Sequence, residues 1–448
     1  MRSAAGAAAT GIAAPTALNL AAMSTASAAD ATDYKALVCV FLYGANDQYN
    51  TLVPFDSANY NQYAQFRQSL AVPHSSLTNT MLSTSQTLPG GKQYALAPQM
   101  TQLSQIWQEQ NMGVLLNVGP LVVPTSKAQF EQQSVPLPPK LFSHNDQASV
   151  WQSLAAEGAT TGWGGRMADL FESANTNSLF TSISLFGNAV YLSGERALQY
   201  QMTASGPVTL NGRSYDVYRH PAMSQMIEQM VVSNNIGHQM AEIQAQVARR
   251  SIDANETLSA ALATTGAFIT PQNDTPLGNQ LETVARMIKV RDQLGMKRQV
   301  FFVGMNGFDH HDGLSVKHPQ LMAELDAALS TFYRTTQEMG VADKVTSFTA
   351  SDFGRTLTGN GDGTDHGWGS HHFVVGGAVQ GQQYWGQAPE LGDNGPDDVG
   401  RGRLLPTTAV EQYTASLGRW FGVSESELND IFPRLKDFDS QDMGILGA

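Results

Sequence analysis

Apolar segments that end abruptly in polar residues constrain the fold of this chain most strongly. "KALVCVFLYGAND" (35–47) runs almost without interruption through apolar residues and then ends in Gly, Asn and Asp. "RQVFFVGMNGFDHH" (298–311) has the same form, and "VLLNVG" (114–119) is a further apolar run. "KVTSFTASDFGR" (344–355) also reads as a strand followed by a polar loop. Short continuous apolar runs bounded by turn residues are typical of parallel strands that are covered on both faces. They predict a sheet buried between two layers.

Helical patterns separate these strands. "PQMTQLSQIWQEQNMG" (98–113) and "HPQLMAELDAALSTFYRTTQEMG" (318–340) space their apolar residues at helical intervals, and Gly340 is a plausible helix end. Alternation of strand and helix predicts an α/β fold with a mostly parallel sheet. Between about 150 and 295 the pattern changes to short strands followed by a long helix, roughly 222–262. We interpret this stretch as a helical insertion in a single domain over 30–448.

Composition excludes one class of partner and one kind of cross-link. Asp and Glu number 39 against 26 Lys and Arg, a formal net charge of −13. Such a surface repels nucleic acid. Cys39 is the only cysteine, so no disulfide forms within the chain, and we expect Cys39 to be a buried apolar residue.

The first 29 residues are typical of an export signal. One arginine is followed by small and apolar residues, and "ASA" at 26–28 fits a cleavage site. A twin-arginine signal fits best, although the arginine pair is missing, so we expect the full signal to begin a few codons upstream. The mature protein would then be periplasmic or secreted. The other reading is the N-terminus of a cytoplasmic protein. No later stretch is apolar enough to span a membrane.

Four strand boundaries carry polar side chains that suit metal binding. In parallel sheets the carboxyl ends of the strands meet at one edge, where ligands bind. The side chains there are Asp47, Asp309, His311, Asp352 and the histidines of "DHGWGSHH" (365–372). Carboxylates and imidazoles together suit a transition metal such as Zn or Mn, and Ca or Mg less well. His366 is the favoured ligand of the last cluster, His371 a second candidate, and His372 is not expected to bind. Each feature alone also fits a turn or a helix cap.

"LFSHNDQASVWQS" (141–153) adds a candidate nucleophile. Ser143 and His144 precede an expected helix, whose N-terminus favours anions. Ser143 is either a nucleophile activated by a metal or the N-cap of that helix.

Motifs spread over nearly the whole mature chain resemble one protein family. "LVCVFLYGANDQYNTLVPFD", "SHNDQ", "GWGGR", "GFDHH", "TASDFGRT" and "GDGTDHGWGSHHFVVGGAVQG" occur in this order. They are similar to the bacterial domain-of-unknown-function 1501 family, whose members are mostly exported and which is grouped with the alkaline phosphatase and sulfatase superfamily. The resemblance implies an alkaline-phosphatase-like three-layer sandwich, in which helices flank a central, mostly parallel sheet and metal ligands stand at strand ends.

The resemblance also implies roles for individual residues. Asp47 and Asp352 would bind one metal beside the nucleophile Ser143, and Asp309, His311 and His366 would bind a second. Arg355 or Arg166 would hold the oxyanion of an ester. Asp365 and His144 also belong to the matched pattern.

Two departures bear on activity. The phosphatases have a histidine where this chain has Phe353, and Asp309 and His311 are two residues apart instead of four. His144, His371 or His372 would compensate, or one metal site is lost. We therefore expect an exported hydrolase of small-molecule or glycan phosphate or sulfate esters, with one or two divalent metals. Two alternatives stay open: a non-catalytic binding protein with at most one metal, and a hydrolase that uses water without Ser143.

Overall fold

The computed structural model describes residues 31–208, 221–233 and 239–447. The expected signal, residues 1–29, lies outside them. Over the described residues no helix has both the length and the apolar character needed to cross a membrane.

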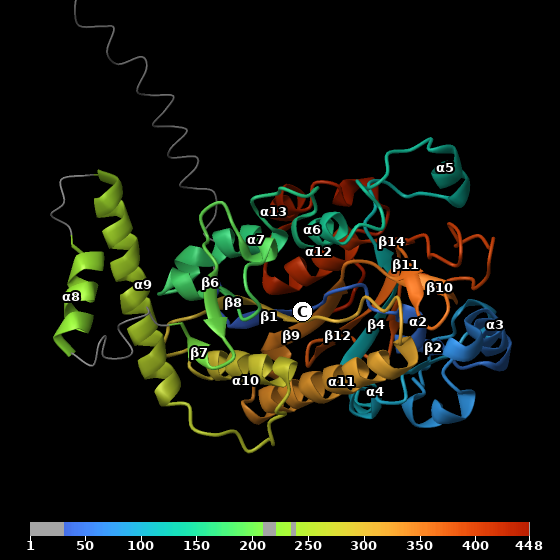
Figure 1. Cartoon of the computed structure of the whole chain (residues 1–448), viewed down its shortest axis with the longest axis horizontal. Helices are drawn as coiled ribbons and strands as arrows, with labels where there is room; N and C mark the ends of the chain where they lie inside the picture. Colours follow the sequence, from blue (N-terminus) through green and yellow to red (C-terminus); the bar gives the residue numbers. More distant parts are fainter. Residues whose placement is uncertain (1–30, 209–220, 234–238, 448) are drawn as a thin grey trace, which may run out of the picture.

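A large mixed sheet forms the centre of the molecule (Figure 1). Its order is β13-β4-β12-β9-β1-β8-β5-β6-β7, and β14 pairs with β4 beside this path. β9, β1, β8, β5 and β6 pair in parallel, β12 is antiparallel to both of its neighbours, and β7 is antiparallel to β6. The strands are β1 (Lys35–Leu42), β4 (Met112–Gly119), β5 (Ser182–Ser184), β6 (Tyr200–Thr203), β7 (Gly206–Pro207), β8 (Arg298–Met305), β9 (Val345–Ser351), β12 (Ser370–Gly376), β13 (Tyr384–Trp385) and β14 (Thr408–Ala409).

Helices cover both faces of this sheet. In Figure 1, α4, α10 and α11 lie on one side, and α6, α7, α12 and α13 on the other. The helices are α2 (Gln48–Thr51), α3 (Ser57–Arg67), α4 (Thr101–Gln108), α5 (Lys127–Gln132), α6 (His144–Ser153), α7 (Trp163–Phe171), α8 (Pro221–Val231), α9 (Gln239–Ala263), α10 (Pro276–Lys289), α11 (Leu314–Glu338), α12 (Val410–Phe421) and α13 (Glu425–Ile431). The predicted α/β sandwich with a mostly parallel sheet is confirmed.

Strand β1 shows why the apolar runs are continuous. Val38 and Val40 belong to the core beneath α10 and α11, whereas Leu37 and Phe41 belong to the core beneath α7 and α12. Successive side chains of a strand point to opposite faces, so a strand covered on both sides buries every residue. Cys39 is buried on the second face, as expected.

The stretch from 150 to 295 differs in detail from the sequence interpretation. It supplies β5, β6 and β7 to the main sheet as well as helices. The single helix expected over 222–262 is instead two helices, α8 and α9. Helical periodicity continues across 232–233, which are not helical, so the pattern did not reveal the break.

Two small sheets complete the carboxyl edge of the main sheet. β2 (Leu52–Pro54) pairs with β3 (Tyr94–Leu96), and β10 (Arg355–Gly359) pairs with β11 (Thr364–His366). β1, β8 and β9 are neighbours and parallel, so the loops after all three open toward this same edge.

A buried carboxyl group in α12 makes the stability of this fold depend on pH. Glu411 is 1% exposed, and burial raises its pKa to about 7. The native state therefore keeps a proton that the unfolded chain loses above its ordinary pKa of 4.5. This contribution to stability is complete below pH 4.5 and is lost as the pH rises through about 7.

Glu411→Gln should remove this dependence. We expect the melting temperature of the variant to exceed that of the wild type at pH 8 and to differ little at pH 4.5. The gain at pH 8 should be at most about 3 kcal/mol, the equivalent of the pKa shift. Thermal unfolding at both pH values measures it, with the exposed Glu195→Gln as the control. An equal effect of Glu411→Gln at both pH values would contradict a protonated Glu411.

Candidate metal centre

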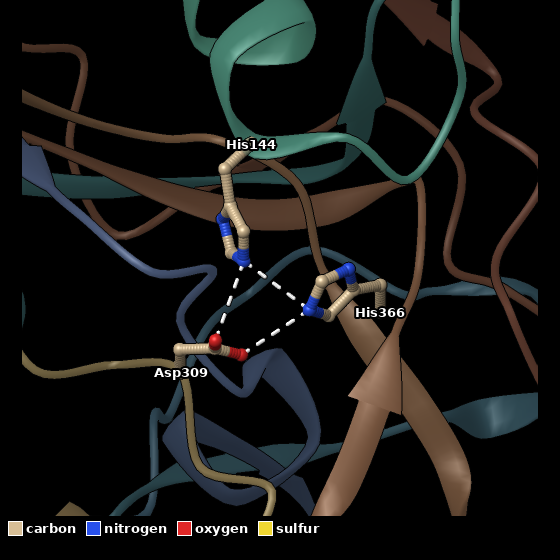
Figure 2. A group of neighbouring side chains, drawn as sticks. All are labelled: His144, Asp309 and His366. Atoms are coloured by element: carbon tan, nitrogen blue, oxygen red, sulfur yellow. Dashed lines mark hydrogen bonds and ion pairs between the residues drawn. The ribbon is translucent and has the colours of Figure 1, made fainter.

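Three side chains from distant segments converge at the carboxyl edge of the sheet (Figure 2). His144 is the first residue of α6, Asp309 lies in the loop after β8, and His366 ends β11. One ligand atom from each lies within 4.8 Å of the others. All three side chains are partly exposed, so a solute can reach the group.

The separations within this group suit ligands of a single ion. His144 Nε2 lies 3.2 Å from His366 Nε2 and 3.5 Å from Asp309 Oδ2, and His366 Nε2 lies 3.3 Å from Asp309 Oδ1. Four ligands about 2.0 Å from a tetrahedral zinc ion lie roughly 3.3 Å from one another. The three separations all fall near this value.

Hydrogen bonds on the far side of each ring turn the Nε2 lone pairs toward one another. His144 Nδ1 lies 2.7 Å from Asp352 Oδ2, and His366 Nδ1 lies 2.8 Å from the carbonyl oxygen of Phe142. A carboxylate and a carbonyl only accept, so both Nδ1 atoms donate. In a neutral ring with a protonated Nδ1 the lone pair is on Nε2, so the two Nε2 atoms face each other as potential ligand atoms. Such outer partners are typical of metal-binding histidines.

His311 stands at the open side of the group. Its Nε2 lies 3.0 Å from His366 Nε2 and 3.1 Å from Asp309 Oδ1, and its Nδ1 lies 3.4 Å from Asp365 Oδ1. His311 is the most exposed of the four side chains, at 46%. The group that could share one ion is therefore two imidazole nitrogens and one carboxylate, from His144, His366 and Asp309, with His311 beside it; such donors fit a divalent transition metal.

Arg355 holds the carboxylate of Asp309 in place. Its Nη1 donates to Asp309 Oδ1 at 2.6 Å, and its other nitrogens donate to the carbonyl and hydroxyl oxygens of Thr364. Burial alone would raise the pKa of Asp309, but the hydrogen bond and charge of Arg355 outweigh it and hold that pKa below its ordinary value. Asp309 is therefore ionised and aimed at the histidines.

The turn after β1 needs glycine to bring these pieces together. Gly44 has a φ of +105°, and a Cβ there would lie 2.6 Å from the backbone nitrogen of Asp309. Its own N–H donates to Asp352 Oδ2 at 2.9 Å. Asp352, which directly follows β9, thus orients the ring of His144. The turn after β1 orients Asp352 in the same way, through the N–H of Gly44. Hydrogen bonding to Asp352 raises the pKa of His144.

Phe353, the main departure from the phosphatase pattern, packs on two of the candidate ligands. Its ring centre lies 4.8 Å from that of His144 and 4.9 Å from that of His366. The apolar ring restricts the motion of both imidazoles, and His144 supplies an imidazole from another element.

Asp47 lies outside the group. It is fully buried at the N-cap of α2, and Arg67 of α3 binds it with two hydrogen bonds of 2.6 Å. Burial raises the pKa of Asp47, but the charge of Arg67 outweighs burial and lowers it overall. Arg67 thus supplies the positive charge that a second metal would have supplied.

Three further residues singled out in the sequence lie elsewhere. His371 is buried in β12, where its Nδ1 accepts the N–H of Asn117 at 3.0 Å, and burial lowers its pKa to about 3. His372 is buried in the same strand, next to Trp151. Arg166 donates to the carbonyl oxygens of Ser153 and Ile431, so it ties helices together.

Ser143 directly precedes the candidate ligand His144, but its hydroxyl does not bond to any of the three candidate ligands. It occupies the N-cap position of α6, but its side chain does not cap the helix. Its hydroxyl instead donates to Asp146 Oδ2 at 2.8 Å. Asp146 is 3% exposed, and Lys140 lies 3.3 Å from its other oxygen. Ser143 therefore has a carboxylate positioned to accept its proton.

Sequence reasoning missed several residues that organise the site. Arg67 neutralises Asp47, and Arg401 pairs with Asp365. Arg403 donates to the backbone oxygen of His366 at 2.6 Å. The signal that could have found Arg401 and Arg403 is "GRGR" at 400–403, two arginines separated by one glycine in a chain with only 26 Lys and Arg residues.

Comparison with known proteins identifies a family and weak structural likenesses. The family model described as "Protein of unknown function (DUF1501)" matches residues 34–432. No curated protein matches the sequence.

Among solved structures, the chain is similar to the PsFucS1 sulfatase from Pseudoalteromonas sp. (TM-score 0.35, 11% identity, 96% of this chain and 75% of that chain). It is also similar to the lipoteichoic acid synthase LtaP from Listeria monocytogenes (TM-score 0.32, 8% identity, 94% of this chain and 76% of that chain). Likenesses this weak say nothing about chemistry in this chain.

The bond from Asp352 to His144 can be tested apart from any activity. We expect Asp352→Asn to weaken metal affinity about tenfold or more, because His144 loses the carboxylate that fixes its ring. Competition with a chromophoric chelator measures the affinity, and the exposed Asp292→Asn is the control. Unchanged affinity in Asp352→Asn would show that this bond does not support metal binding.

Proposed function

The chain belongs to the DUF1501 family, and we propose that it is an exported, metal-dependent hydrolase of phosphate or sulfate esters. The observation that carries the proposal is the convergence of His144, His366 and Asp309, with both Nδ1 atoms committed to acceptors behind the rings. Both Nε2 atoms and the carboxylate of Asp309 then face one another at distances that a shared cation would satisfy.

We propose one metal ion rather than two. The pairing of Asp47 with Arg67 leaves neither oxygen of Asp47 for a second ion. Mixed imidazole and carboxylate donors suit Zn, or Mn, whereas Ca and Mg prefer sites made only of oxygen. His144, Asp309 and His366 would hold the ion, and His311 would complete the donor set.

The chain's own groups fit hydrolysis of a charged ester. A bound divalent ion would polarise the ester oxygen and supply positive charge. Ser143 Oγ would attack the phosphorus or sulfur atom, Asp146 would accept the hydroxyl proton across their 2.8 Å hydrogen bond, and the bond to the ester oxygen would break and release the alcohol. Water would then cleave the phosphate or sulfate from Ser143 and restore the hydroxyl. The first N–H groups of α6 are not capped by Ser143 and would favour a negatively charged group at that end of the helix. Arg355 would keep Asp309 ionised throughout.

The substrates would be small-molecule or glycan esters outside the cytoplasm. The partly exposed site admits a solute, and the signal-like residues 1–29 favour export. A net charge of −13 argues against nucleic acid as substrate.

Metal content tests the centre directly. Elemental mass spectrometry of protein purified without chelators should give about one equivalent of a transition metal, lost in an Asp309→Ala, His366→Ala double variant. A matched double variant, Asp292→Ala with His74→Ala, removes the same residue types away from the group and should keep the metal. Absence of metal from the folded wild type would refute the proposed mechanism.

Ser143→Ala tests the nucleophile. We expect turnover of phosphate or sulfate esters to fall on the order of 10³-fold or more, with metal content unchanged. Ser149→Ala, on the same helix but bonded to the carbonyl oxygens of Ala155 and Ala156, should retain turnover. If Ser143→Ala keeps its turnover, water attacks the ester without a serine intermediate.

A further inference from the structure

The two arginines first expected to hold an ester's oxyanion are already occupied. Arg355 has no exposed side-chain surface, and its three nitrogens all donate hydrogen bonds to Asp309 and Thr364. Arg166 binds carbonyl oxygens of α6 and α13. A charged ester therefore needs a different cation from the chain.

The turn Arg401-Gly402-Arg403 places two arginines beside the metal group. Gly402 has a φ of +70°, and a Cβ there would lie 2.3 Å from Cβ of Leu357. Its carbonyl oxygen accepts from the N–H of Leu357 at 3.2 Å and from the hydroxyl of Tyr49 at 2.8 Å. The turn is thus fixed against β10, and its position does not depend on either arginine side chain.

The two arginine side chains straddle the end of β11. Arg401 pairs with Asp365, the acceptor behind His311. Arg403 Nε donates at 2.6 Å to the backbone oxygen of His366, the residue that follows Asp365. Arg401 is committed to a carboxylate, whereas Arg403 contacts only backbone oxygens and a ring.

Arg403 keeps one donor group available. Its Nη1 donates to the carbonyl oxygen of Gly400 at 3.1 Å, and its guanidinium lies 5.1 Å from the ring centre of Phe142. Nη2 makes no hydrogen bond within the part of the chain that the structure describes. Phe142 holds His366 Nδ1 and directly precedes Ser143. The guanidinium of Arg403 therefore lies between β11, which carries the candidate ligand His366, and the loop that carries Phe142 and the candidate nucleophile Ser143.

We propose that Arg403 binds the oxyanion of the substrate, a sulfate or phosphate group, through its free Nη2 edge. The assignment rests on the proposed hydrolase function and adds its charge-recognising residue. A partly buried guanidinium that is fixed by backbone oxygens is pre-organised for such a group, and its planar donors suit tetrahedral oxyanions.

Binding of inorganic anions tests this assignment without turnover. Isothermal titration calorimetry with sulfate, and separately with phosphate, is run on the metal-loaded and the metal-free protein. Arg403→Gln should weaken binding of the recognised anion about tenfold to a hundredfold, as expected for loss of a charged hydrogen bond. Arg403→Lys should recover part of the affinity. Arg196→Gln, which removes an exposed positive charge elsewhere, should not change it.

The readouts separate this proposal from the proposed function. Metal content of Arg403→Gln should equal that of the wild type, and with an ester substrate KM should rise much more than kcat falls. An effect confined to sulfate or to phosphate identifies the ester class. Equal affinity of Arg403→Gln and wild type for both anions would overturn the role of Arg403, even where metal and turnover are present. Lack of metal or turnover in the wild type would instead count against the hydrolase.

Discussion

Burial of β9, β1 and β8 between two helical layers is the constraint from which the site follows. In strands covered on both faces every side chain is buried, and the three strands contain no carboxylate, so carboxylates gather where the strands end. Because the three strands are parallel neighbours, their ends meet at one edge, and Asp309 and Asp352 arrive there from loops far apart in sequence. Gly44 allows the close approach of the β1 turn, and His144 and His366 are added by α6 and β11.

The buried pair of Asp47 and Arg67 sets the number of cations that the edge accepts. A carboxylate with no exposed surface must be neutralised, and a bidentate guanidinium does so without a metal. Removing either partner would leave an unpaired buried charge. Arg67 already neutralises Asp47, and the group that could hold a proposed metal ion lies elsewhere, at His144, Asp309 and His366.

The sequence predicted the fold class and most of the segments that form the site, because both depend on local patterns. Apolar runs marked β1, β8 and β9, and the polar residues after them marked Asp309, His311 and Asp352. The partners of these residues depend on tertiary contacts that no spacing encodes. Arg67 comes from a separate helix, and the acceptor behind His366 is a backbone carbonyl of Phe142, which any residue carries. His371 was a candidate ligand and His372 was not, but β12 buries both in the sheet, where His372 contacts Trp151.

Local charge explains how a strongly acidic protein can receive an anion. Around the site four carboxylates, Asp47, Asp309, Asp352 and Asp365, stand against four guanidinium groups, Arg67, Arg355, Arg401 and Arg403. With neutral histidines these charges cancel, although the whole chain carries −13. Three of the arginines are bound to carboxylates, whereas Asp352 is bound by His144 and the N–H of Gly44, and Arg403 keeps a free donor. A divalent ion would then make the site positive, and the field at short range would outweigh the screened charge of the remaining surface.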